Sequence, residues 1–316
     1  MQVFMTVFLK MMSMAFILVF GFILKRKKVL SDSAGTVIGQ LATNFVFPCL
    51  AFSGLYNSVS DINTLISGLS YIVWGIAVFG IATLCAYLFS PLLTKDSYER
   101  SLFRYSLVFS NYGFFGIAVI LSILGTEAYF PFAMFTIPGT ILLYAWGLPQ
   151  ITPHDGQENL SAGAKAKAIA KSMVNVTNIA MLLGIACGLL GIKVPAFLMD
   201  ACTSAGNLLS PLGMLLAGIS VASLSFKGAF SDLKIWAISI IRLIVMPLIF
   251  FGVCKIVAPD AALYGVIICY AAMPLGMNTV VIPAAYGKDT TVGTKMTLIS
   301  TLLCLVTIPL IVTIFL

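Results

Sequence analysis

Residues 270–287, YAAMPLGMNTVVIPAAYG, join an apolar composition to residues that interrupt helices. Pro274 lacks a backbone donor and leaves a carbonyl unpaired, and Gly276 permits backbone angles that other residues resist. A helix that restarts near Asn278 would direct unpaired N–H groups and about half a positive charge at the break. Such a helix start binds anions, and the Asn278 amide can donate to a carboxylate or accept from a cation.

A second group of this kind occurs in SNYGFFG, where Asn111, Tyr112 and Gly113 follow one another. If both helices break and cross, Asn111 and Asn278 lie close together, and their amides can hold one small ligand. The alternative is that Pro and Gly only kink the helices for packing, since both are common in membrane helices. Their occurrence in both halves of the chain favours a binding site.

Charged side chains in apolar segments give a second indication. Lys10 and Arg242 lie within such segments, whereas all eleven Asp and Glu lie in loops or at segment ends. A carboxylate proton relay inside the membrane is therefore not expected. For Arg242 two interpretations stay open, namely contact with a substrate or gate, and a structural tie to helix-end carbonyls. Lys10 is close enough to a segment end for its amine to reach the interface.

The composition identifies the class of protein. Of 316 residues, 60% are apolar and only 9% are charged. The mean hydropathy is +1.07. A soluble domain cannot bury that much apolar surface, so we predict an all-α polytopic membrane protein embedded in a lipid bilayer. The net charge of +7 lies mostly in short loops, where it reports topology and not nucleic-acid binding. The seven Cys form no CxxC pair and are interpreted as apolar fillers.

Ten apolar segments are expected to span the membrane. Their approximate limits are 3–24, 36–57, 64–90, 101–124, 128–149, 172–191, 195–224, 234–257, 260–287 and 290–316. The odd-numbered connections hold fourteen of the 18 Lys and Arg. This bias places those connections in the cytoplasm and both termini outside it, in the plasma (inner) membrane.

The fifth connection divides the chain into residues 1–150 and 172–316, with a cytoplasmic linker at 151–171. The linker holds the only histidine, His154, which we interpret as a solvated side chain. Five spans on each side of it predict two inverted repeats. Short patterns recur in matching order: NFVFP (Asn44, Pro48) with NLLSP (Asn207, Pro211), the Asn111 and Asn278 breaks, and a Thr-Ile-Pro triplet in each last span.

At these residues the sequence resembles the auxin efflux carrier family, the bacterial relatives of plant auxin exporters, and the wider superfamily that includes bile acid:sodium symporters. The matching pieces are FGFILKRKKVL, NFVFPCLAF, SNYGFFGIAVILSILGTEAY, RLIVMP, AAMPLGMNTVVIPAAYGKD and TLISTLLCLVTIP, which together cover nearly the whole chain. The resemblance implies ten helices, with the fourth and ninth broken and crossing. It also implies a scaffold or dimer domain (spans 1, 2, 6, 7) and a transport domain (spans 3–5, 8–10) that moves against it like an elevator. Whether the protein forms a homodimer through the scaffold domain stays open.

The resemblance further implies a carrier of small organic anions such as malate, malonate or auxin-like carboxylates. It places the ligand at Asn111 and Asn278, with the breaks at Tyr112, Gly113, Pro274 and Gly276 around it. Secondary candidates for substrate binding are Asn44, Pro48, Ser210 and Pro211. Arg242 is a further candidate because it is a charged residue within an apolar segment.

The sequence bears differently on three other functions. Residue patterns of an intramembrane enzyme, such as HExxH, GxGD or a carboxylate pair within a span, do not occur in the sequence, so catalysis, a metal centre and a cofactor are not expected. An anion channel would conduct far above carrier turnover. A sodium-coupled symporter of the bile acid type stays open, since Na⁺ can bind carbonyls freed at helix breaks. Uncoupled efflux is the remaining case, because membrane voltage supplies roughly 2.3 kcal/mol per charge per 100 mV.

Overall fold

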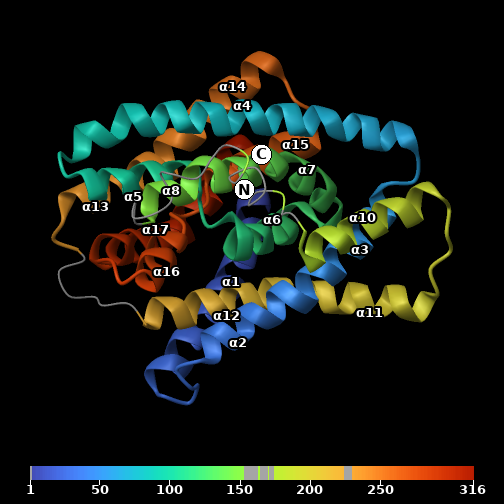
Figure 1. Ribbon diagram of the computed structural model, residues 1–316, viewed down its shortest axis with the longest axis horizontal. Helices are drawn as coiled ribbons and strands as arrows, with labels where there is room; N and C mark the ends of the chain where they lie inside the picture. Colours follow the sequence, from blue (N-terminus) through green and yellow to red (C-terminus); the bar gives the residue numbers. More distant parts are fainter. Residues whose placement is uncertain (1, 153–162, 164–169, 171–173, 224–229) are drawn as a thin grey trace.

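The computed structural model describes residues 2–152, 163, 170, 174–223 and 230–316, and this part of the chain is helical apart from short connections (Figure 1). His154 and most of the predicted linker lie outside the described residues. The helical segments, in chain order, are α1 (Gln2–Arg26), α2 (Ala34–Leu41), η1 (Ala42–Val46), α3 (Phe47–Ser58), α4 (Ile62–Leu93), α5 (Ser97–Val108), η2 (Tyr112–Gly116), α6 (Ile117–Leu124), η3 (Thr126–Ala128), α7 (Tyr129–Leu142), η4 (Leu143–Gly147), α8 (Leu148–Ile151), α10 (Val176–Leu189), α11 (Ala196–Asn207), α12 (Leu209–Ala222), α13 (Leu233–Ile240), η5 (Ile241–Val245), α14 (Met246–Val257), α15 (Ala261–Ala271), α16 (Asn278–Ala285) and α17 (Thr291–Phe315).

Seven helical stretches among the described residues are long and apolar enough to cross a membrane. Two shorter apolar helices, α10 and α15, fall within the expected sixth and ninth segments. The expected fourth segment, 101–124, contains α5 and the η2–α6 helix with a break between them. Large apolar side chains stand exposed along these helices, as in α1 and α4, which is the surface that lipid would cover. The chain is a multi-pass membrane protein.

Three of the helices widen into a π-helical turn just before a proline. The turns η1, η4 and η5 each end two residues before Pro48, Pro149 and Pro247, respectively. Proline removes one backbone donor and its ring clashes with the carbonyl four residues earlier. A wider turn relieves that clash without ending the helix. The repeated NFVFP pattern that contains Pro48 therefore coincides with a distorted turn, which the sequence did not predict.

The helices form two groups, which can be distinguished in the view down the shortest axis of the molecule (Figure 1). In Figure 1, α2, α3, α11 and α12 lie low in the view with α10 at the right beside α3, and α4, α5, α7, α13, α14 and α15 lie above them. Helix α1 packs chiefly on α12, and α3 packs on α10 and α11. Helix α4 packs on α5 and α7, and α13 packs on α17. The η2–α6 helix contacts α12, so the fourth segment lies where the two groups meet.

Three of the odd-numbered connections lie side by side. Lys234 pairs with Glu99 at 3.0 Å, and Lys295 lies 3.8 Å from Asp232. The Tyr98 hydroxyl donates to the Asp289 carbonyl at 2.9 Å. These contacts join the third, seventh and ninth connections. That arrangement is the one that the positive-charge bias requires, although the direction relative to the cytoplasm stays a prediction.

Candidate functional site

Two helices break at the same place and meet there. Helix α5 ends at Val108 and the chain becomes helical again at Tyr112, while α15 ends at Ala271 and α16 begins at Asn278. The two gaps run antiparallel, with a bridge between Ser110 and Leu275. The Asn111 N–H donates to the Pro274 carbonyl at 2.9 Å. Each gap therefore satisfies part of the other's backbone, which is how non-helical chain is tolerated at membrane depth.

Gly276 is required by this close approach. A Cβ added to it would lie 2.7 Å from the Phe109 carbonyl oxygen, nearer than real contacts allow. The N–H of the preceding residue, Leu275, donates a hydrogen bond to the Ser300 hydroxyl on α17 at 3.1 Å. The crossing is thus fixed from two sides, by the opposite break and by α17. We refer to residues 109–112 and 272–278 as the crossover.

Arg242 lies beneath the crossover and is fully buried. Its Nη1 donates to the Leu107 carbonyl at 2.8 Å, its Nη2 to the Tyr270 carbonyl at 2.9 Å, and its Nε to the Met273 carbonyl at 3.3 Å. The guanidinium also lies 5.2 Å from the Tyr270 ring centre. Of the two interpretations left open by the sequence, these contacts match the structural tie to helix-end carbonyls.

Polar side chains with spare hydrogen-bonding capacity lie at the crossover. The Ser110 hydroxyl is buried without a hydrogen-bond partner among the described residues. The half-buried Asn111 carboxamide also lacks one in this part of the chain, whereas the exposed Asn278 Nδ2 donates to the Tyr105 hydroxyl at 2.9 Å. A buried hydroxyl without a partner costs free energy unless a ligand or water satisfies it. Ser110 and Asn111 therefore favour a polar ligand at this place.

Tyr112 and Gly113 line the start of the second half-helix. The Tyr112 ring packs against the rings of Tyr270 and Phe132, with centroids 5.7 and 6.4 Å apart. Gly113 is exposed, and a Cβ there would meet no atom within 4 Å. One side of this helix start is thus packed with aromatic rings and the other is open. Pro274 is buried, as expected for a residue whose carbonyl is paired across the bridge.

The four secondary candidates lie on the other group of helices. Asn44 is exposed on η1, and its Nδ2 donates to the Gln40 carbonyl of its own helix at 2.9 Å. Pro48 is buried and Pro211 exposed. The Ser210 hydroxyl lies 3.2 Å from that of Ser122 on α6. Hydrogen bonds among the described residues do not join any of these four to Asn111 or Asn278, so their part in binding stays a prediction.

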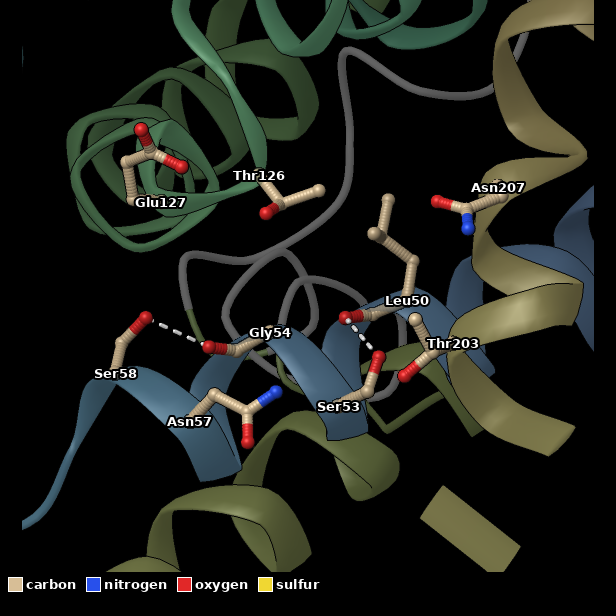
Figure 2. Close-up of a pocket in the computed structure, with 9 residues that line it drawn as sticks. All are labelled: Leu50, Ser53, Gly54, Asn57, Ser58, Thr126, Glu127, Thr203 and Asn207. Atoms are coloured by element: carbon tan, nitrogen blue, oxygen red, sulfur yellow. Dashed lines mark hydrogen bonds between the residues drawn. The ribbon is translucent and has the colours of Figure 1, made fainter. Parts of the chain in front are cut away.

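A separate pocket of about 190 Å³ opens between α3, η3 and α11 (Figure 2). Seven of its nine lining residues are of polar types: Leu50, Ser53, Gly54, Asn57, Ser58, Thr126, Glu127, Thr203 and Asn207. Thr126 and Asn207 face it from opposite sides, and the Ser53 and Ser58 hydroxyls bond within α3. It lies toward the even-numbered connections. No local sequence pattern predicts this pocket, because its residues come from three separate segments.

The sequence also did not identify four further residues of the site: Tyr105, Tyr270, Ser110 and Ser300. Only their position next to the two helix breaks in the structure identifies them. Groups of three or more His, Cys, Asp or Glu that could hold a metal ion do not occur in the described part. Carbonyl oxygens at the breaks, with the side-chain oxygens of Ser110, Asn111 and Asn278, are the remaining ligands for a cation such as Na⁺. Those of Leu107, Tyr270, Met273 and Pro274 already accept hydrogen bonds.

A helical multi-pass protein with two broken helices that pack against each other resembles the architecture of membrane carriers. The family comparison agrees. A model of the family described as "Membrane transport protein" matches residues 6–312. The chain therefore belongs to this auxin efflux carrier-like membrane transport family, which confirms the resemblance carried by the sequence motifs. It is a transporter family and not an enzyme family.

A relative among curated proteins is an "Uncharacterized transporter" from Methanothermobacter thermautotrophicus (strain ATCC 29096 / DSM 1053 / JCM 10044 / NBRC 100330 / Delta H). It is 25% identical to this chain over 303 residues, which are 95% of both proteins. The similarity thus extends across both breaks.

Proposed function

We propose that the protein is a secondary carrier of small organic anions, such as malate, malonate or auxin-like carboxylates, with the substrate held at the crossover. The observation that carries this proposal is the antiparallel bridge between Ser110 and Leu275, which brings two helix starts together. The first turns of η2 and α16 have N–H groups without helical acceptors and a partial positive charge. Ser110, Asn111 and Asn278 add side-chain donors for a carboxylate.

The proposed architecture is ten spans in two inverted five-span repeats. Its support is that matching positions are distorted in both halves. The breaks at Asn111 and Asn278 match in order, and the NFVFP and NLLSP patterns coincide with the η1 turn and with the junction between α11 and α12. Unrelated kinks would have no reason to recur in this order.

For movement, we propose an elevator in which the group containing α4, α5 and α13–α17 shifts against a scaffold of α1–α3 and α10–α12. The pocket of Figure 2 has α3 and α11 on the scaffold side and η3 on the moving side. Motion along that boundary would open or close it, which makes it a route from the crossover toward the even-numbered connections. A homodimer through the scaffold is part of the same proposal.

A thermal-shift screen of organic acids on the purified protein tests the substrate class. We expect one or more carboxylates to raise the unfolding temperature of the native protein but not of Asn278→Ala. Asn63→Ala is the matched control, because it removes an exposed amide in the first turn of α4, outside the crossover and the secondary candidates. Equal stabilisation of native protein and Asn278→Ala would remove Asn278 from the site.

Uptake into proteoliposomes separates the remaining mechanisms. Uptake of radiolabelled malonate that follows an imposed voltage and ignores Na⁺ supports an uncoupled carrier. Strict dependence on Na⁺ would instead establish the symporter alternative. Conductance far above carrier turnover, with no counterflow, would establish a channel.

A further inference from the structure

We propose that Arg242 is a built-in counter-cation, which neutralises the carbonyl ends of the two broken helices and so makes the crossover selective for anions without a sodium ion bound there. This inference rests on the proposed function of the crossover as an anion site. It assigns to Arg242 a positioning and charge-setting role and no contact with the substrate.

The electrostatic problem follows from the geometry of two crossed half-helices. Two helix ends and two helix starts meet at the crossover. Helix ends carry about half a negative charge on their unpaired carbonyls, and helix starts carry about half a positive charge. Left alone, these four partial charges would nearly cancel, and the site would favour neither anions nor cations.

Arg242 removes this balance of partial charges, because all three of its hydrogen bonds go to carbonyls at the C-terminal ends of the two half-helices. Leu107 is in the last turn of α5, Tyr270 is in the last turn of α15, and Met273 lies just beyond it. The Tyr270 hydroxyl donates to the Val108 carbonyl, which satisfies a further carbonyl of α5. The starts of η2 and α16 are not covered in this way, so the crossover keeps an excess of positive charge.

The charge of Arg242 is not cancelled by a carboxylate. The salt bridges in the described part join residues at loops and helix ends, and the partners found for Arg242 are carbonyls and the Tyr270 ring. A buried cation normally requires an acidic partner. Here the helix ends take that place, which explains how a fully buried guanidinium is tolerated.

The same contacts occupy the groups that a coupling ion would need. In carriers with broken helices, unwound carbonyls and half-helix ends coordinate Na⁺. The guanidinium already binds these carbonyls on both broken helices, and the π-helical turn η5 holds it there. The tethered cation therefore does at this place what a dissociable Na⁺ would otherwise do.

The test measures unfolding temperature and malonate uptake for Arg242→Ala, Arg242→Lys and Arg242→Met. Removal of the guanidinium takes the side-chain donor from three buried carbonyls, of which that of Tyr270 keeps the Met273 N–H at 3.3 Å, so Arg242→Ala should unfold at a lower temperature. Millimolar methylguanidinium should restore part of the loss, while neutral methylurea, of similar shape, should not. If methylurea restores it equally, or if Arg242→Ala is as stable as the native protein, the charge-setting role is wrong.

The uptake arm separates charge from shape. Arg242→Lys keeps the cation and should retain malonate uptake that is indifferent to Na⁺, whereas the similarly long Arg242→Met should lose roughly tenfold or more. Equal uptake by the two variants, or native uptake that requires Na⁺, would overturn the inference. If the native protein transports none of malonate, malate or indole-3-acetate, the proposed substrate class fails, and the methylguanidinium result alone then decides the role of Arg242.

Discussion

Gly276→Ala is the sharpest structural perturbation of the crossover. The new Cβ would lie 2.7 Å from the buried Phe109 carbonyl oxygen, so the two antiparallel gaps must move apart. Overpacking of this kind lowers the free energy of unfolding by about 1–3 kcal/mol. Strain on the hydrogen bond from the Asn111 N–H to the Pro274 carbonyl lowers it by up to about 1 kcal/mol more. The lower entropy of the unfolded alanine chain offsets about 0.4–1 kcal/mol. The net expectation is a loss of about 1–3 kcal/mol.

The assay is thermal unfolding of the purified variant, followed by malonate uptake into proteoliposomes. Gly80→Ala is the matched control, since a Cβ on this exposed α4 glycine meets no atom within 4 Å. We expect Gly276→Ala to unfold at a lower temperature and to lose uptake, while Gly80→Ala keeps both. If Gly276→Ala behaves like Gly80→Ala, the two breaks do not pack as described.

Three further predictions concern the Asn278 amide, the membrane topology and the Asp289 carboxyl. Tyr105→Phe removes the partner of the Asn278 amide, and a lost hydrogen bond of about 1 kcal/mol should raise the KM for malonate roughly fivefold; an unchanged KM would mean that this bond does not orient Asn278. Cysteine at position 288 should react with an impermeant thiol reagent only from the cytoplasmic side, and cysteine at position 193 only from outside; the reverse pattern would invert the proposed topology. The Thr291 hydroxyl and N–H donate to Asp289 and lower the pKa of that carboxyl, so its stabilising effect is present above the unfolded pKa and is lost as pH falls through the folded pKa. The unfolding temperature of the native protein should therefore drop below about pH 4 by more than that of Asp289→Asn, and parallel curves would contradict this assignment.

The sequence was sufficient to predict the breaks but not what holds them. Pro274, Gly276 and Asn111 act locally, since each alters the helix in which it lies, so their effect can be inferred from residue type alone. The π-helical turns before Pro48, Pro149 and Pro247 follow from the same local chemistry, although they were not predicted.

Contacts between distant segments could not be predicted in this way. Arg242 bonds to Leu107 and Tyr270, which are far from it in the chain, and no local pattern encodes which carbonyls a buried guanidinium reaches. The orphaned Ser110 hydroxyl and the pocket beside Glu127 likewise depend on how the two helix groups pack. For Arg242, the sequence showed only a lone cation within an apolar segment. That observation left two interpretations open, and the hydrogen-bond partners in the structure distinguish them.

An experimental structure with bound organic acid tests the central claim most directly, using the acid that gives the largest thermal shift. The account predicts density for a carboxylate within hydrogen-bonding distance of Ser110, Asn111 or Asn278, between the starts of η2 and α16. Density for the acid only in the pocket between α3, η3 and α11, or continuous helices through residues 109–111 and 272–277, would contradict it.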